Sequence, residues 1–133
     1  MKQVKITKKA PKTIFCDIDG TLIRHPNHDG NERLYHIPKS DHEAEALPGT
    51  LEKLWDWEAK GYNIILTTGR KESMRYATEL QLRRVGIFWD HLIMGLGSGQ
   101  RYLINDLEPE TDVDTANAIN LKRDAGIGTI EEL

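Results

Sequence analysis

Two aspartates, Asp17 and Asp19, stand one residue apart directly after an apolar run of β-branched and aromatic residues, Thr13-Ile-Phe-Cys16. Such a run predicts a buried strand that ends in the polar pair Gly20-Thr21. Side chains at i and i+2 of a strand share a face, so the two carboxylates can converge. Converging carboxylates repel each other unless a cation, a proton or hydrogen bonds offset their negative charge, and a bound divalent metal ion would do so most directly. The alternative is an ordinary Asp-Gly turn.

Polar residues also follow two other predicted strands. Thr68 comes after the apolar run 62–67, and Asn105 and Asp106 come after the short run 102–104. In open parallel sheets ligands bind beyond the carboxyl ends of the strands. The agreement of three strand ends therefore favours a functional site over an isolated turn.

This set of residue types suits phosphate chemistry. An acid at the first strand end can attack phosphorus if a metal neutralises the repulsion, and a second acid can pass a proton to the leaving oxygen. The Thr68 hydroxyl and backbone N–H groups, with Gly69 among them, can hold phosphate oxygens. Asp106 would complete an oxygen-rich site suited to Mg²⁺.

Strands and helices are predicted to alternate along the chain. Further strands are expected over residues 62–67, 89–94, 102–104 and 127–130, and helices over residues 50–60, 71–85 and 112–125. The strands are apolar throughout, which is expected where helices cover both faces of a parallel sheet. The predicted fold class is α/β, a Rossmann-like three-layer sandwich with a mainly parallel sheet.

The first predicted helix has identifiable ends and an apolar face. Thr50 is the expected N-cap and Gly61 the expected stop, with Leu51, Leu54 and Trp55 along one face. Trp57 is expected to be half exposed. Three glycines in the loop 95–99 are interpreted as flexibility, or as backbone room beside a substrate.

Length and composition fit one domain with a core over residues 13–130. Residues 24–47 form a polar insertion directly after the candidate site and are predicted to act as a flap. The insertion has four histidines but no cysteine, so solvated or substrate-contacting histidines are favoured over a zinc site.

The net charge of −3 gives no overall attraction to nucleic acid or membranes. Cys16 is the only cysteine, so an intramolecular disulfide is impossible, and strand alternation predicts that its side chain is buried. No apolar run is long enough for a membrane span. These features predict a cytoplasmic protein, either a monomer or a homodimer.

Three segments resemble motifs of the haloacid dehalogenase-like (HAD) phosphatases. Asp17-Ile-Asp-Gly-Thr21 is similar to their first motif, Ile64-Ile-Leu-Thr-Thr-Gly-Arg70 to their second and Leu103-Ile-Asn-Asp106 to their fourth. The resemblance spans about residues 13–130. It implies a magnesium-dependent phosphomonoesterase that works through a phospho-aspartyl intermediate, without a separate cap domain.

The resemblance also implies roles for individual residues. Asp17 would be nucleophile and metal ligand, and Asp19 the general acid/base that gives its backbone carbonyl to Mg²⁺. Thr68 would bind phosphate and Asp106 would bind Mg²⁺. The family's third motif is a basic residue, usually lysine, but no lysine occurs between Lys71 and Lys122, so Arg101 is the candidate substitute. Asn105 is neutral where the fourth motif often has an acid.

The expected substrate is a small phosphorylated metabolite such as a sugar phosphate. Removal of a 3′-phosphate from a nucleic acid end is the enzymatic alternative, which the net acidity and the lack of a clear basic stripe disfavour. A weakly active phosphate-binding or regulatory domain is the non-enzymatic alternative.

Overall fold

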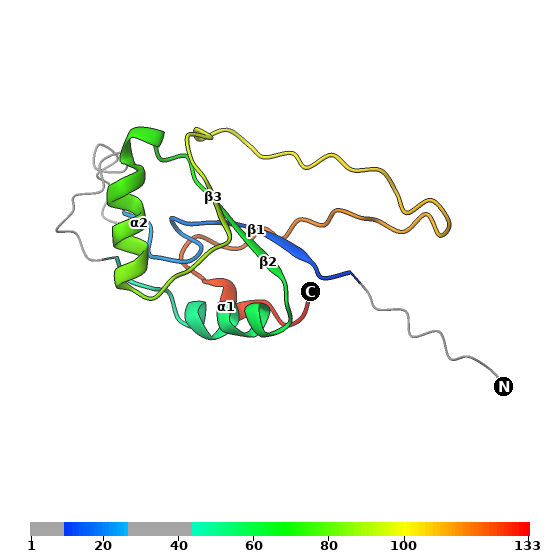
Figure 1. Cartoon of the computed structure of the whole chain (residues 1–133), viewed down its shortest axis with the longest axis horizontal. Helices are drawn as coiled ribbons and strands as arrows, with labels where there is room; N and C mark the ends of the chain where they lie inside the picture. Colours follow the sequence, from blue (N-terminus) through cyan, green and yellow to red (C-terminus); the bar gives the residue numbers. More distant parts are fainter. Residues whose placement is uncertain (1–9, 27–43) are drawn as a thin grey trace.

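The computed structural model describes residues 10–26 and 44–133 (Figure 1). Most of the predicted flap, residues 27–43, lies outside the described residues. The elements, in chain order, are β1 (Thr13–Asp17), α1 (Thr50–Ala59), β2 (Asn63–Thr67), the 3₁₀ helix η2 (Glu72–Met74), α2 (Arg75–Arg84), β3 (His91–Ile93) and the 3₁₀ helix η3 (Ile127–Thr129). Within those residues no helix has the length and apolar character of a membrane span.

The three strands form one parallel sheet in the order β1-β2-β3. The register pairs Asp17 with Thr67 and Thr67 with Ile93, so the strands end side by side. The chain therefore delivers the residues after Asp17, after Thr67 and after Ile93 to the same edge of the sheet. The predicted α/β class with a parallel sheet is confirmed.

The core lies between the sheet and the two α-helices. Alternation along β2 buries Ile64 and Leu66 completely, and Leu54 of α1 and Leu82 of α2 are equally inaccessible. Cys16 of β1 joins this core, as predicted. Burial, with a smaller contribution from the charge of Asp17, raises the pKa of its thiol to about 12, so Cys16 is a protonated packing residue.

Helix α1 begins where predicted, but its cap and its buried face differ from the prediction. Gly49, with φ of 82°, occupies the N-cap position, and the buried Thr50 hydroxyl instead donates to the Leu22 carbonyl at 2.8 Å. Trp57 is 3% exposed, whereas Trp55 is 61% exposed and packs its ring against that of Phe88. Residues 50, 54 and 57 share one helical face, and position 55 lies about 100° from position 54.

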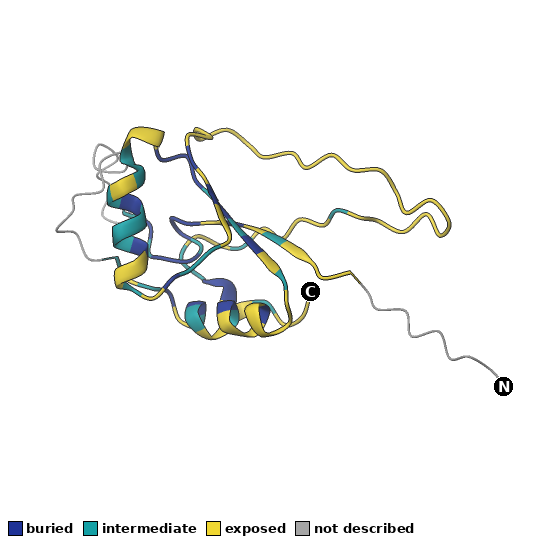
Figure 2. Ribbon diagram, viewed as in Figure 1, coloured by how far each residue is buried: buried dark blue, intermediate teal, exposed yellow. Residues whose placement is uncertain are grey.

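Residues 101–120, called the arm below, contain no helix or strand. They leave the body of the molecule and return to it, and nearly all are exposed (Figures 1 and 2). The predicted strand over 102–104 is therefore wrong: Tyr102 is 83% and Ile104 89% exposed. A turn at the outer end is held by hydrogen bonds between Glu108 and Val113 at 2.9 Å and between Asp112 and Glu108 at 2.9 Å.

The predicted helix over 112–125 and strand over 127–130 are also wrong. The helix region is rich in aspartate and asparagine, whose side chains compete with helix formation by bonding to nearby backbone, and Asp112 and Asp124 have positive φ. Residues Ile127–Thr129 form η3, which packs against α1. The single buried side chain of η3, Ile127, joins the core.

Candidate active site

Asp17 lies at the carboxyl end of β1 with its residue surface exposed. Partial desolvation is the largest influence on its pKa and raises it, and the charge of Asp19 raises it further. A hydrogen bond from the Ile18 N–H, the positive charge of Arg101 and a hydrogen bond with Thr21 oppose these effects without cancelling them. Asp17 is thus an exposed residue with a partly desolvated carboxyl, and the positive charge of Arg101 offsets part of the negative charge of that carboxyl.

Asp19 is in the opposite situation, because its side chain is 1% exposed and is paired with Arg70. Arg70 donates from Nε to Oδ2 at 2.9 Å and from Nη2 to Oδ1 at 2.7 Å, which is a bidentate contact. Sequence reasoning placed Arg70 only at the end of a motif and gave it no role. An arginine after the second strand end, near two acids in need of a cation, was the available signal.

Thr68 follows β2 as predicted and is buried with it. Its N–H donates to the Ile93 carbonyl at 3.0 Å, and its own carbonyl accepts from the Leu96 N–H at 3.1 Å. Its hydroxyl accepts from the Arg70 N–H at 3.1 Å. Because a hydroxyl both donates and accepts, the Thr68 hydroxyl can also donate to a phosphate oxygen that reaches the strand end.

The glycine loop 95–99 packs directly against Gly69. A Cβ on Gly69 would lie 2.4 Å from the Gly97 carbonyl oxygen, so only glycine fits at position 69. Arg101 donates from Nη2 to the Gly97 carbonyl at 2.8 Å and from Nη1 to the Gly99 carbonyl. These two contacts fold the guanidinium back onto the glycine loop, and the backbone of the loop lies close to Gly69.

The chain returns from the arm to cover the turn after β1. The Asp124 N–H donates to the Gly20 carbonyl at 2.8 Å, and the His25 N–H donates to Asp124 Oδ1 at 2.7 Å. Burial and the charge of Arg123 lower the pKa of His25, while Asp19 and Asp124 act in the opposite direction. Arg123 and Asp124 lie near the site although sequence reasoning assigned them only to a helix.

Asp106 is not brought to the strand ends. It is exposed on the arm, where its backbone carbonyl accepts a hydrogen bond from Thr115 Oγ1. Within residues 10–26 and 44–133, no three acidic, histidine or cysteine side chains gather to hold a metal ion. Of the three predicted Mg²⁺ ligands, Asp17 and Asp19 lie at the end of β1 and just beyond it, and Asp106 lies on the arm.

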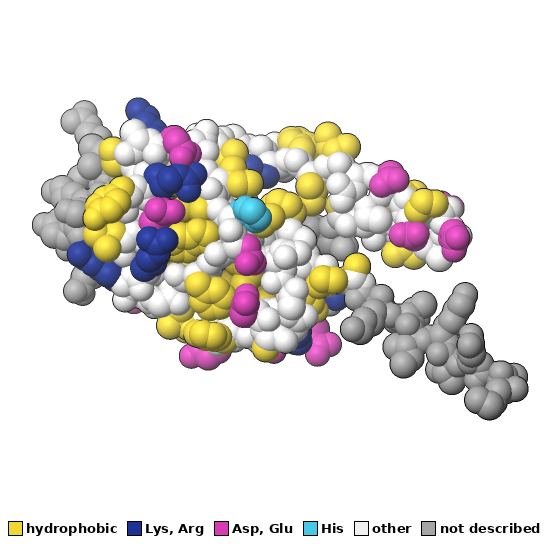
Figure 3. Space-filling model, in the orientation of Figure 1, with side chains coloured by type: hydrophobic (Ala, Val, Ile, Leu, Met, Phe, Trp, Pro, Cys, Tyr) yellow, Lys and Arg dark blue, Asp and Glu magenta, His cyan; other side chains and the backbone are white. Residues whose placement is uncertain are grey.

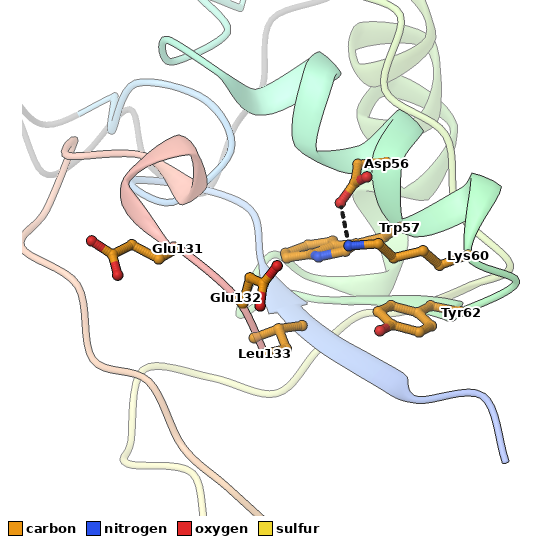
Figure 4. A pocket seen from close by; sticks show the side chains of 7 residues that line it. All are labelled: Asp56, Trp57, Lys60, Tyr62, Glu131, Glu132 and Leu133. Atoms are coloured by element: carbon orange, nitrogen blue, oxygen red, sulfur yellow. Dashed lines mark hydrogen bonds and ion pairs between the residues drawn. The ribbon is translucent and has the colours of Figure 1, made fainter. Parts of the chain in front are cut away.

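A separate pocket lies beside the C-terminal end of α1 and the start of β2 (Figure 4). It is lined by Asp56, Trp57, Lys60, Tyr62, Glu131, Glu132 and Leu133. Lys60 is held by Asp56 at 2.9 Å on its rim. This pocket contains none of the motif residues, and the strand ends are therefore the stronger candidate for chemistry.

The charges on one face of the molecule are unevenly distributed (Figure 3). Basic side chains gather over α2, which contributes Arg75, Arg83 and Arg84, and acidic side chains gather at the outer end of the arm. The arm residues Glu108, Glu110, Asp112 and Asp114 are all exposed. The arm therefore presents a repulsive surface to an extended polyanion.

Two solved structures resemble this fold. One, described as the structure of the Pnkp1/Rnl/Hen1 RNA repair complex, is 26% identical with a TM-score of 0.51, covering 70% of this chain and 30% of that chain. A second, described as the structure of the Pnkp1/Rnl/Hen1 complex, is 25% identical with a TM-score of 0.51, covering 77% of this chain and 36% of that chain. This chain thus spans about a third of those chains.

No curated protein matches the chain. The family described as HAD superfamily, subfamily IIIB (acid phosphatase), matches residues 1–103, which include the first two motifs and Arg101. An exposed aspartate at the end of β1, followed by a buried acid, agrees with that match. The chain belongs to the HAD superfamily, subfamily IIIB.

Proposed function

We propose that Asp17 attacks the phosphorus of a phosphomonoester, forming an aspartyl–phosphorus bond as the bond to the leaving oxygen breaks. Asp19 gives a proton to that oxygen and then takes one from the water that hydrolyses the phospho-aspartyl group. The observation that carries the proposal is the position of Asp17, a surface-exposed residue at the end of β1 that lies within the electrostatic influence of Arg101. A nucleophile needs this access and this compensation of charge.

Arg101, Thr68 and Gly69 are proposed to bind the phosphate. Arg101 lies close enough to Asp17 for its charge to lower the pKa of the carboxyl, so the same guanidinium can reduce the repulsion between Asp17 and a phosphate. The glycine loop holds it in this place through the carbonyls of Gly97 and Gly99. Arg101 then supplies the charge that the family's third-motif lysine supplies elsewhere.

Phosphatases of this superfamily generally use a divalent metal. We propose Mg²⁺ for this chain, with Asp17, the Asp19 backbone carbonyl and Asp106 as ligands, because these are hard oxygen donors. Bound there, Mg²⁺ would offset the charge of the phosphate. The described position of Asp106 does not fit this set, so binding requires residues 101–106 to approach β1. Calorimetric Mg²⁺ titration of the wild type and Asp106→Asn tests this directly.

The proposed substrate is a small phosphorylated metabolite such as a sugar phosphate. The acidic outer end of the arm disfavours a long polyanion near the molecule. Similarity to chains of a complex described as an RNA repair complex makes a 3′-phosphorylated nucleic acid end the second candidate. Rates on sugar phosphates and on a 3′-phosphorylated oligonucleotide, at low and high salt, separate the two, since phosphate contacts weaken steeply with salt.

The nucleophile is tested with Asp17→Asn, which keeps the side-chain shape but removes the attacking carboxylate. Phosphate release from a panel of phosphomonoesters is expected to fall by about 10³-fold or more, as when other nucleophiles are removed. Asp114→Asn, the same change at an exposed arm position, is the matched control and should leave the rate unchanged. Full turnover by Asp17→Asn would refute the proposed mechanism.

A further inference from the structure

The pairing of Asp19 with Arg70 is unusually complete. Both carboxylate oxygens accept from the guanidinium, at 2.7 and 2.9 Å, and the two side chains are 1% and 3% exposed. A planar guanidinium that contacts both oxygens fixes the plane of the carboxylate as well as its position. A lysine ammonium at the same place would supply the positive charge but would not fix the plane of the carboxylate.

The guanidinium is itself fixed by a second element. Its remaining nitrogen, Nη1, donates to Thr78 Oγ1 at 3.2 Å and to Gln81 Oε1 at 2.8 Å, both on α2. Contacts on all three guanidinium nitrogens leave one rotamer that satisfies them together. Helix α2 therefore sets the position of Arg70, and Arg70 sets the position of Asp19.

The backbone of Arg70 is held as well. Its N–H donates to Thr68 Oγ1 at 3.1 Å, and its carbonyl accepts from the Gly95 N–H at 2.7 Å. Arg70 is thus joined to the end of β2, to the glycine loop and to α2. Such a buried ion pair contributes little net stability, because desolvation of both charges offsets their attraction. Its geometric precision calls for a different explanation.

The geometry points to Arg70 as a positioning residue for proton transfer by Asp19, an inference that rests on the proposed function. A carboxylate has about four lone-pair directions, so two contacts with Arg70 leave directions that can take and release a proton. With its plane fixed, the carboxyl presents these directions in one orientation, which proton transfer to a leaving oxygen requires. Arg70 acts through Asp19 and touches neither the substrate nor the phosphorus.

The test uses two substrate classes that differ in their need for a proton. An alkyl phosphate such as glycerol phosphate has a poor leaving oxygen that must be protonated, whereas nitrophenyl phosphate has a leaving group that departs as an anion. Arg70→Lys keeps the charge but removes the planar fork. We expect kcat/KM, which reports the step that breaks the bond to the leaving oxygen and not the later hydrolysis of the phospho-aspartyl group, to fall by about 100-fold on the alkyl ester and by less than about threefold on the nitrophenyl ester.

Two further variants complete the experiment. Thr78→Val removes one acceptor of Arg70 Nη1. It should lower the alkyl-to-nitrophenyl rate ratio, by less than Arg70→Lys does. This variant tests the assignment even if Arg70→Lys does not fold. Arg75→Lys changes an arginine of the same helix that pairs with Glu72 at the surface, and should leave the ratio unchanged.

The ratio of the two rates distinguishes positioning from a merely structural role. Equal losses on both esters with Arg70→Lys, or an unchanged ratio with both Arg70→Lys and Thr78→Val, would overturn the assignment. Failure of the proposed function has a different signature, since Asp17→Asn would then retain turnover on both substrates.

Discussion

Predicted site residues lie both at the strand ends and on the arm, and the two regions differ in how tightly the surrounding structure fixes these side chains. At the strand ends the predicted residues Asp19 and Thr68, and the unpredicted Arg70, are each nearly inaccessible, and they form hydrogen bonds with one another. On the arm Asp106 is exposed, among apolar residues that are exposed as well. Packing from several elements fixes the side chains at the strand ends, whereas only local turn contacts hold the arm around Asp106.

This difference has a consequence for the chemistry. A carboxylate buried in a network has one orientation, which suits proton transfer, and a carboxylate on an exposed arm has a large conformational entropy to lose before it can bind an ion. We therefore expect substitutions at the strand ends to affect both folding and activity. Substitutions on the arm should affect only those steps of binding or catalysis in which a residue of the arm takes part.

The largest expected effect comes from breaking the buried pair. Arg70→Ala leaves the Asp19 carboxylate buried without its partner, and should lower the free energy of unfolding by about 3–5 kcal/mol. On the arm, Asp106→Ala should change it by less than about 0.5 kcal/mol. Urea unfolding of both variants measures the contrast directly. Similar values for the two variants would show that the strand ends and the arm are equally well packed.

A smaller effect is expected where the glycine loop meets Gly69. Gly69→Ala places a Cβ 2.4 Å from the Gly97 carbonyl oxygen, so the loop must move, at a cost of about 1–3 kcal/mol. Because the carbonyls of Gly97 and Gly99 in this loop hold Arg101, the KM for phosphomonoesters should rise as well. Gly99→Ala is the matched control, since its Cβ would meet no neighbouring atom within 4 Å. Equal stability of the two variants would contradict the close approach.

The smallest expected effect is a change of pH dependence. The raised pKa of Asp17 means that the carboxylate needed for attack forms only as the pH rises above the ordinary range of an aspartate. Arg101 lowers this pKa, so Arg101→Gln should raise it further and move the acid limb of the kcat/KM profile to higher pH. Arg83→Gln, on the far end of α2, should leave the limb in place. A shift to lower pH would exclude Arg101 as the compensating charge.

Much of the fold and part of the site followed from local sequence patterns. The apolar runs that became β1 and β2, the α-helix that follows each of them in the chain, and the burial of Cys16 all depend on residues close together in the chain. Asp17, Asp19 and Thr68 could be placed at strand ends for the same reason. The predicted strand over 102–104 failed because three apolar residues define a strand only when a neighbouring strand pairs with them.

The chain by itself therefore determined an α/β fold of the HAD superfamily with an aspartate at the end of its first strand. The tertiary structure alone decided that Trp57 rather than Trp55 faces the core, and that Asp106 lies on the arm. It also decided that Arg70 pairs with Asp19, 51 residues earlier in the chain. Local periodicity predicts which residues begin and end an element, but a contact between distant residues depends on how the elements pack, and the position of Asp19 is set by such a contact.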